Sequence, residues 1–294
     1  MEKMKKYIGE LGLITTAIIW GSGFAATAIA IENYTAYQTM FVRFIVGALI
    51  LCILFPKRLK KINKSTIFKG AILGLILYLA FALQTVGLQF TTPSKNAFLT
   101  AVNVVIVPFI SFVIYKKYLD RYEVLGAILA VTGVGIISLQ LTNAINFGDF
   151  LSLLCAFAFA FHIFYTARFV VNNDAILLTL IQMVTAAVFG FLVIFIQGDV
   201  IIPFEARSLF SMLYLGLFST ATAFLLQTAS QKFVSETKAA IILSTEAVWG
   251  MVFSMIIIGE IITLRMAIGA AIILLAIIIA EVKVNPFKII FLRQ

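Results

Sequence analysis

One carboxylate, Glu246, lies inside a long apolar stretch of this chain, about eight residues from its nearer end. An ionised carboxylate is costly in apolar surroundings, so this group should be paired, hydrated or protonated. Such a group could carry a proton or anchor the amine of a bound molecule. It could equally make a structural hydrogen bond to a neighbouring helix. The sequence leaves both interpretations open.

The other reactive side chains are few and scattered. His162 is the only histidine, and it could titrate near neutral pH or simply satisfy a hydrogen bond. Cys52 and Cys155 both lie in apolar runs, so no disulfide framework is implied. We find no Ser/His pair, no paired carboxylates and no metal-ligand spacing. The sequence therefore predicts no metal, no cofactor and no enzymatic activity.

Polar and aromatic residues recur together at helical spacing. Asn96, Thr100 and Asn103 illustrate this, because they fall at i, i+4 and i+7 on one helix face. A face of this kind suits a cavity that binds small amphipathic solutes. The candidate cavity residues are Trp20, Thr100, Asn103, His162, Tyr165, Gln227, Glu246 and Trp249.

Several of these polar residues have a second interpretation. Gln84 and Gln227 either border gates in a solute path or link helices through amide hydrogen bonds. Trp20 either stacks on a substrate or packs against its neighbours. We interpret Arg43 as structural, with its side chain snorkelling to the outer interface.

The composition requires lipid around these elements. The chain has 294 residues, of which 62% are hydrophobic and 12% charged. A soluble domain carries roughly a quarter charged residues, so this chain cannot cover its surface in water. The net charge of +9 sits in short clusters between apolar runs, without a basic stripe. We therefore expect contact with membrane lipid and none with nucleic acid.

Long apolar runs predict ten membrane-spanning helices, since a span needs roughly 20 residues. They cover about 10–30, 36–55, 67–90, 94–115, 122–140, 149–170, 175–197, 208–229, 238–258 and 264–282. The first run is too long, and its Trp20–Gly23 centre too polar, for a cleaved signal peptide. Pro108 alone among the prolines lies within a span, where it should bend the helix.

Basic residues set the expected orientation. With the N-terminus in the cytoplasm, 18 of the 22 Lys and Arg fall on the cytoplasmic side, including the run Lys57–Lys69. Lys95, Arg207, Arg265 and Arg43 are the exceptions. Ten spans with both termini cytoplasmic fit this asymmetry.

An internal duplication organises the spans. Leu83-Gln84-Thr85 recurs 143 residues later as Leu226-Gln227-Thr228, and this offset also pairs Asn103 with Glu246. Earlier positions align at an offset of 139, which pairs Gly9-Glu10 with Gly148-Asp149. The offset changes by four in the loop after the second helix of each repeat. We therefore predict two five-helix domains, 1–143 and 144–294, which cross the membrane in opposite senses.

Two motifs carry a family resemblance. Trp20-Gly21-Ser22-Gly23-Phe24 with Arg43, and Ser244–Val248 followed by Gly259-Glu260, resemble an EamA-type member of the drug/metabolite transporter superfamily. The chain departs from the usual pattern at Ala247, where the family has a proline, and at Lys117, the repeat partner of Glu260.

The resemblance implies an alternating-access carrier. Spans 1, 3, 4, 6, 8 and 9 would line a central cavity, while spans 5 and 10 lie outside. Members of the family commonly export amino acids and related metabolites. Independently of the resemblance, spans 5 and 10 are nearly uniformly apolar in this chain, which is typical of helices that face lipid or form a dimer.

We therefore predict a multi-pass secondary carrier in the bacterial cytoplasmic (plasma) membrane, either monomer or homodimer. Its solute would be a small polar or amphipathic metabolite such as an amino acid, moved outward as the two repeats rock about a midplane site, with Glu246 as the coupling candidate. Two alternatives stay open: an exporter of cationic drugs or amines, and a membrane sensor or assembly partner that moves no solute.

Overall fold

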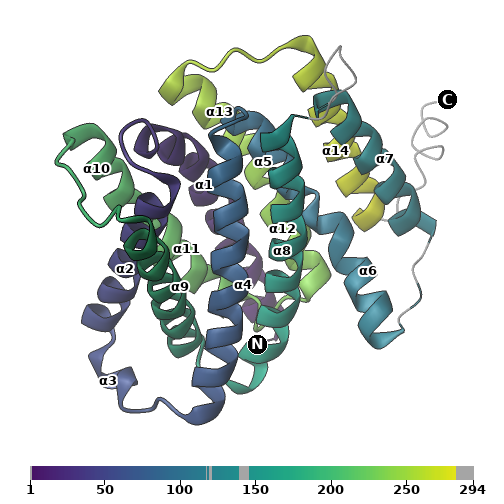
Figure 1. The fold of residues 1–294 in the computed structure, drawn as a ribbon. Coiled ribbons are helices and arrows are strands. Elements are labelled where there is room, and N and C mark those ends of the chain that lie inside the picture. The colour runs from purple at the N-terminus through teal and green to yellow at the C-terminus, as the bar shows by residue number, and fades with distance from the viewer. Residues whose placement is uncertain (1, 117, 119–120, 139–145, 283–294) are drawn as a thin grey trace, which may run out of the picture.

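The computed structural model describes residues 2–116, 118, 121–138 and 146–282. All regular secondary structure in this part of the chain is helical, with no strand, so the predicted all-α class is confirmed. The helices stand side by side in a bundle (Figure 1). The predicted domain boundary at 143/144 lies outside the described residues, as does Lys117.

The helices of the first half are α1 (Glu2–Ala30), α2 (Ala36–Leu54), α3 (Pro56–Leu59), α4 (Lys64–Leu88), α5 (Pro93–Ala101), α6 (Asn103–Tyr115) and α7 (Arg121–Ser138). Those of the second half are α8 (Phe147–Phe169), the short η1 (Val170–Asn172), α9 (Ala175–Gln197), α10 (Ala206–Tyr214), η2 (Leu215–Thr222), α11 (Ala223–Ser230), α12 (Glu236–Ser244), α13 (Glu246–Ile258) and α14 (Leu264–Val282).

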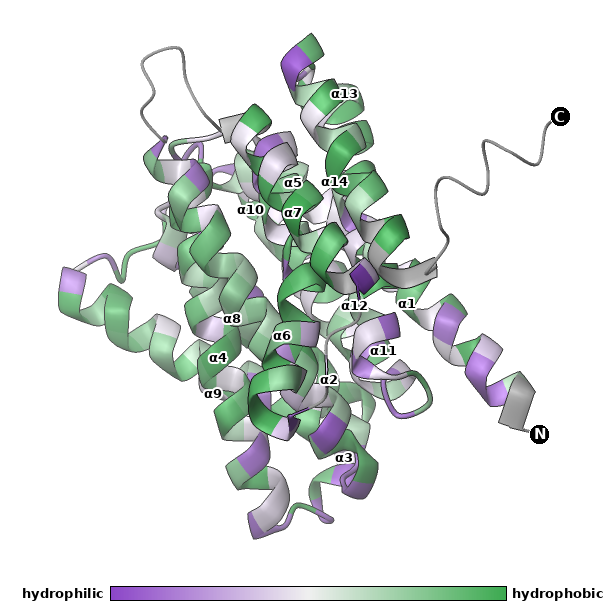
Figure 2. Ribbon diagram, turned by 90° about the vertical axis from the view of Figure 1, so that its right-hand side faces the viewer, coloured by the Kyte–Doolittle hydropathy of each residue, from purple (hydrophilic) through white to green (hydrophobic). Residues whose placement is uncertain are grey.

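Eight helical stretches among the described residues are long and apolar enough to cross a membrane. They are Met4–Ala30, Ala36–Leu54, Lys64–Leu88, Pro93–Tyr115, Phe147–Asn172, Ala175–Gln197, Ala206–Ser230 and Glu236–Ile258. The remaining two expected spans correspond to α7 and α14, whose apolar stretches, Val124–Ile136 and Leu264–Ala276, are shorter. Figure 2 shows apolar residues along the helices and polar ones concentrated near their ends.

Side-chain caps explain why the helices begin where they do. Thr35, Asn63, Thr92, Asn146 and Asp174 each accept a hydrogen bond from a backbone N–H in the first turn of the following helix. These residues are the polar breaks in the sequence, and capping satisfies donors that would otherwise be left unpaired at a helix start. The short polar breaks therefore fix the register of each span.

Two spans change their hydrogen bonding at the same repeat position. Between α5 and α6, the Val102 N–H donates to the Leu99 carbonyl at 3.3 Å instead of continuing the i→i−4 ladder. Between α12 and α13, the Thr245 N–H donates to the Ile242 carbonyl at 3.2 Å. Such 3₁₀ turns within a helix are frequent hinge points. Helix α6 continues through Pro108, where the sequence predicts a bend, and the break in the helical hydrogen bonding of this span lies at Val102.

A third span contains the π-helical segment η2, which separates α10 from α11. π segments are rare and frequently lie at functional sites. The offset change of four is also explained by a helix and not by a loop. Leu54, the last residue of α2, aligns with Val193, yet α9 continues to Gln197 for about one further turn.

The two halves of the chain are interleaved. Helix α4 packs against α8 and α9, α2 against α9 and η2, and α1 against α10, α11, α12 and α13 (Figure 1). Helices α7 and α14 pack on each other at one edge of the bundle, as the resemblance implied for spans 5 and 10. The extensive helix contacts thus join one half to the other.

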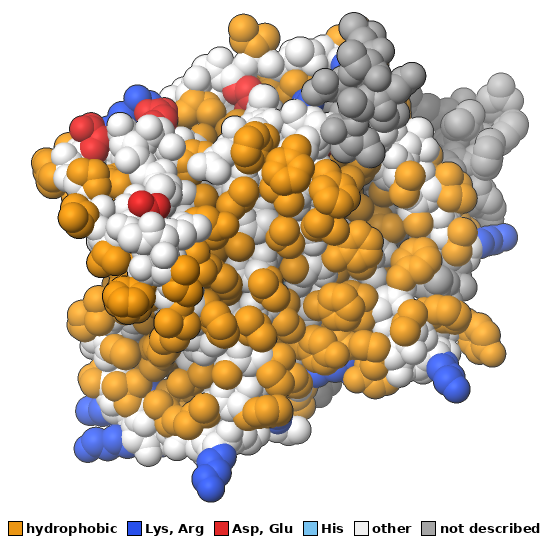
Figure 3. Space-filling model, viewed as in Figure 1, with side chains coloured by type: hydrophobic (Ala, Val, Ile, Leu, Met, Phe, Trp, Pro, Cys, Tyr) orange, Lys and Arg blue, Asp and Glu red, His pale blue; other side chains and the backbone are white. Residues whose placement is uncertain are grey.

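The ends of the bundle differ in charge. In Figure 3, most Lys and Arg side chains lie toward the lower edge, the carboxylates lie toward the upper edge with a few basic side chains among them, and a hydrophobic band separates the two edges. The lower end, which contains α3 and the start of α1, is called the basic face here. The upper end, where α1, α9 and α13 terminate, is called the acidic face. This distribution is the one the charge clusters in the sequence predict.

Ion pairs connect the halves at both faces. Lys238 of α12 contacts Glu10 of α1 at the basic face, with an N–O distance of 2.5 Å. Lys95 of α5 contacts Asp149 of α8 at the acidic face, at 3.5 Å. Lys95 and Lys238 are repeat partners, and so are Glu10 and Asp149. The duplication therefore builds the same cross-half pair twice, once at each face.

Candidate functional site

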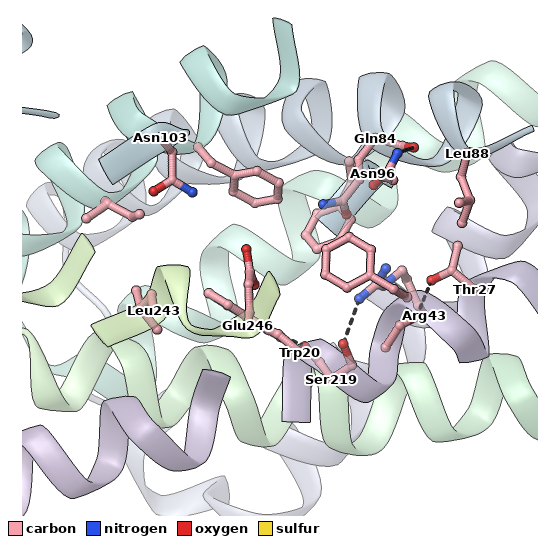
Figure 4. Close-up of a pocket in the computed structure, with 15 residues that line it drawn as sticks. Trp20, Thr27, Arg43, Gln84, Leu88, Asn96, Asn103, Ser219, Leu243 and Glu246 are labelled. Carbon is pink, nitrogen blue, oxygen red and sulfur yellow. Dashed lines mark hydrogen bonds between the residues drawn. The ribbon is translucent and has the colours of Figure 1, made fainter. Parts of the chain in front are cut away.

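A central pocket lies between helices of both halves, with an empty volume of about 530 Å³ that includes some open space. Its walls combine charged, amide and aromatic side chains (Figure 4). The lining residues are Trp20, Gly23, Phe24, Thr27, Arg43, Phe81, Gln84, Leu88, Asn96, Asn103, Phe159, Ile163, Ser219, Leu243 and Glu246. Apolar and aromatic walls with a few polar groups between them are typical of sites for small molecules.

Glu246 and Asn103 occupy equivalent places in the pocket. Each is the first residue of a half-helix, α13 or α6, immediately after the interruption at Thr245 or Val102. Figure 4 shows the two side chains facing one another across the pocket. Glu246 is only 5% exposed, yet among the described residues its carboxylate has no hydrogen-bond or ion-pair partner. One half of the repeat thus supplies a carboxylate where the other supplies an amide.

Arg43 lies toward the other end of the pocket, beside Thr27 and Leu88 (Figure 4). Its side chain is only 2% exposed, so the expected snorkelling to the interface is wrong. Nε donates to Thr220 Oγ1 at 3.0 Å and Nη2 to Ser219 Oγ at 3.2 Å, both in the π segment η2. The guanidinium carbon lies 4.1 Å from the centre of the Phe81 ring, in cation–π geometry.

Trp20 is held by the same π segment. Its Nε1 donates to the Ser219 carbonyl at 3.0 Å, and its ring centre lies 4.8 Å from that of Phe224. Trp20 and Phe159 are repeat partners at the offset of 139, and both line the pocket. The indole therefore combines packing with a pocket surface, the two roles that the sequence left open.

Amides and hydroxyls form a connected polar wall on α4, α5 and α8. Gln84 Nε2 donates to Thr100 Oγ1 at 3.2 Å, and Asn96 Nδ2 donates to Ser152 Oγ at 2.9 Å and to the Gln84 carbonyl at 3.1 Å. Gln84 and Asn96 line the pocket, whereas Thr100 supports Gln84 from behind and contacts Cys155. In this structure Gln84 thus both links helices and faces the cavity.

His162 and Gln227 lie outside the pocket. His162 is fully buried, its Nε2 lies 2.8 Å from Gln182 Oε1, and its ring packs edge-on against Phe224. Gln182 is the repeat partner of Arg43. Gln227 is also fully buried, and its amide has no hydrogen-bond partner among the described residues. The structure thus separates Gln84, which lines the pocket, from its repeat partner Gln227.

Tyr165 and Trp249 also lie away from the pocket. Tyr165 packs among Phe161, Phe164 and Phe169 on α8. Trp249 is 36% exposed and packs beside Phe253, while its backbone and Cβ lie against Gly21 of α1. These two aromatics were grouped with the cavity by helical spacing, which places them within a turn of pocket residues but not on the same face.

Of the predicted residues, the pocket brings together Trp20, Gln84, Asn103 and Glu246. Sequence reasoning missed Arg43 and Ser219 as pocket residues. Arg43 could have been found from its position, because an arginine several residues inside an apolar span is costly unless it faces a cavity. Ser219 carried no such signal. Ser219 lines the pocket as part of the π segment η2, and the local sequence contains no signal that predicts a π helix.

No group of three His, Cys, Asp or Glu side chains within the described ranges is placed to hold a metal ion. The pocket offers instead a cation, a carboxylate, amides and aromatic faces. These groups bind and orient a solute by hydrogen bonds, charge and stacking.

Comparison with known proteins agrees with this architecture. The chain matches the EamA-like transporter family twice, over residues 7–139 and 146–281. It is 31% identical to an uncharacterized transporter of Archaeoglobus fulgidus, over 96% of this chain and 89% of that protein. It is 23% identical to the uncharacterized transporter YdfC of Bacillus subtilis, over 94% of this chain and 92% of that one.

The fold is also similar to that of a protein of known crystal structure. The TM-score is 0.69 at 14% identity, and the match covers 96% of this chain and 97% of the other. The two family matches, the relative from Archaeoglobus fulgidus and the membrane-spanning helices together confirm the resemblance carried by the Trp20 and Glu246 motifs. The chain belongs to the EamA-like transporter family.

Proposed function

We propose that this protein is a secondary carrier that exports small polar or amphipathic metabolites, such as amino acids, by alternating access. It would cross the bacterial cytoplasmic membrane ten times, with the basic face and both termini in the cytoplasm. The two five-helix units, 1–143 and 144–294, would be its inverted repeats.

The observation that carries this proposal is the central pocket. It is lined from both halves, and it contains Glu246 without a partner. The interrupted spans meet at this pocket, as they do in many carriers with inverted repeats. An intramembrane carboxylate facing a cavity is a candidate for proton coupling or for binding an amine.

Repeat symmetry supplies a route to alternating access. Because the halves are interleaved, they cannot rock as two separate bodies without breaking most helix contacts. Bending at Val102 and Thr245 would instead open one face at a time. The Lys95–Asp149 and Lys238–Glu10 pairs would then close the acidic and basic faces in turn.

The strongest alternative is export of cationic amines or drugs, which the unpaired Glu246 also favours. Counterflow in proteoliposomes tests both. Proteoliposomes that contain the purified protein would be loaded with an unlabelled solute, and uptake of the labelled form of that solute would be followed. The measurement would be repeated for each member of a panel of amino acids and amines. Accumulation of one solute class supports a carrier for that class. No counterflow with any solute would favour the membrane sensor over the carrier.

A further inference from the structure

The charge of Arg43 has no anionic partner among the described residues. Its two hydrogen-bond acceptors, Thr220 and Ser219, are neutral, and its other neighbours are the rings of Phe81 and Phe44. A buried guanidinium usually pairs with a carboxylate or another anion, because removing the charge from water is costly. The described residues thus surround Arg43 with neutral hydrogen-bond acceptors and aromatic rings but supply no opposite charge.

The free side of the guanidinium faces the pocket. Nη1 makes no hydrogen bond to any described residue, and Arg43 is part of the pocket lining. The hydroxyls of Thr220 and Ser219 and the Phe81 ring fix the orientation of the planar group. A guanidinium held in this way is preorganised to donate paired hydrogen bonds to a carboxylate.

Glu246 is the complementary unpaired charge of the same pocket. No ion pair joins it to Arg43, so the two charges are held apart within one cavity. A molecule that carries both an anionic and a cationic group would satisfy both residues at once. A simple amine would leave Arg43 unpaired, and a simple carboxylic acid would leave Glu246 unpaired.

We propose that Arg43 determines specificity by binding the carboxylate of a zwitterionic solute whose ammonium group is bound by Glu246. This inference rests on the proposed carrier function and adds the requirement for a carboxylate. The aromatic surfaces of Trp20, Phe81 and Phe159 lie in the same pocket and would contact the apolar part of the solute.

Matched ligands test the requirement on the wild-type protein. Leucine, 3-methylbutylamine and 4-methylpentanoate share one branched side chain. Leucine carries both charges, the second compound only the ammonium group and the third only the carboxylate. Phenylalanine, phenethylamine and 3-phenylpropanoate form a second set. We expect each amino acid to compete for labelled-solute binding at least about tenfold better than either partial analogue, since a hydrogen-bonded charge contributes about this much. Equal competition by the amine would overturn the inference while leaving an amine carrier intact.

Substitutions then test which residue binds the carboxylate of the solute and which binds its ammonium group. Arg43→Gln should weaken amino-acid binding by about 10- to 100-fold and leave amine binding unchanged. Glu246→Gln should weaken amino-acid binding by a similar factor and leave binding of the carboxylic acid unchanged. Arg58→Gln, at the basic face and outside the pocket, is the matched control. Arg43→Lys keeps the charge and tests the need for a planar donor if Arg43→Gln fails to fold. Equal loss of amine and amino-acid binding in a folded Arg43 variant would show a structural role instead.

Discussion

At the scale of single residues, the pocket is built on a broken symmetry. Asn103 and Glu246 share a repeat position and a helix start, but only Glu246 can gain and lose a proton. A symmetric pair of carboxylates would repel each other and share protons. The amide removes that complication, so that proton exchange in this part of the pocket involves one group.

Glu246→Gln should remove the pH dependence of solute binding. In the wild type, protons and the solute ammonium compete for one carboxylate, so the apparent affinity should fall as pH falls. A glutamine binds no proton, so the variant should bind more weakly but equally at each pH at which the solute ammonium stays protonated. Labelled-solute binding to purified protein over a series of pH values measures both effects.

Asn103→Asp provides the matched test of position. Combined with Glu246→Gln, it returns a carboxylate to the pocket from the other half, facing the same space. We expect the double variant to regain part of the pH dependence. An unchanged pH dependence in Glu246→Gln alone would show that another group exchanges the proton.

The site was only partly predictable from the sequence. Glu246, Asn103, Trp20 and Gln84 stood out because polar or bulky residues inside apolar spans are conspicuous. Trp249 and Tyr165 do not line the pocket. Helical spacing shows which residues share a helix face, but not whether that face points toward the pocket or away from it. Arg43 was misassigned for a related reason: its hydrogen-bond partners Ser219 and Thr220 lie 176 and 177 residues away in the chain.

At the scale of helices, the crossing of α1 and α13 depends on small residues. A Cβ on Gly21 would lie 2.3 Å from Trp249 Cβ and 2.8 Å from its carbonyl carbon. A Cβ on Gly250 would lie 2.8 Å from Ala97 Cβ of α5. These contacts bring α13, and with it Glu246, close to α1 and Trp20.

Gly21→Ala should therefore separate α1 from α13. The added methyl group meets backbone, which cannot move aside, so we expect a loss of stability of about 1–3 kcal/mol. Thermal unfolding in detergent, followed by the loss of monodisperse protein, measures the change. Ile14→Ala, on an exposed face of the same helix, is the control and should have a smaller effect. Equal stability of wild type and Gly21→Ala would contradict this packing.

Substitutions that break the two cross-half ion pairs should open the pocket to opposite faces. Glu10→Gln weakens the closure of the basic face, and Asp149→Asn weakens that of the acidic face. In a background with Cys52 and Cys155 replaced by serine, Leu243→Cys places a thiol in the pocket. Glu10→Gln should raise its labelling by an impermeant reagent from the basic face, and Asp149→Asn from the acidic face. Labelling altered in the same direction by both would exclude the alternating role.

The helices themselves were largely predictable, because apolar length and polar breaks determine where a span begins and ends. The breaks in helical hydrogen bonding at Val102 and Thr245 could not be predicted in this way. Val102 is a β-branched residue in an apolar run, with neither glycine nor proline beside it. Only the repeat relation between Val102 and Thr245, at an offset of 143 residues, marks them as a pair of equivalent interruptions.

At the scale of the whole molecule, the charged faces predict orientation. Lys61 lies at the basic face, near Asn63 and Asp174. In a cysteine-free background, Lys61→Cys should be labelled by an impermeant thiol reagent in inside-out vesicles and not in intact cells. Ile201→Cys, in the α9–α10 loop, should show the reverse. Labelling of Lys61→Cys from outside the cell would invert the proposed topology.

The duplication indicates two similar segments but not how they fit together. Matching sequence offsets show that two segments are alike, and they say nothing about which helices touch. The fold pairs α4 with α8 and α9 and α1 with α13, so that each half completes the core of the other.

This interleaving affects how the chain is made. Ribosomes release the N-terminal half first, when α1, α2 and α4 lack the helices that cover them in the finished bundle. At roughly 5–20 residues per second, the second half needs on the order of ten seconds or more to follow. During that interval Arg43 lacks Ser219 and Thr220, and Asn96 lacks Ser152. In pulse-chase experiments, a truncated first half should be degraded by membrane proteases, and co-expression of the second half should protect it.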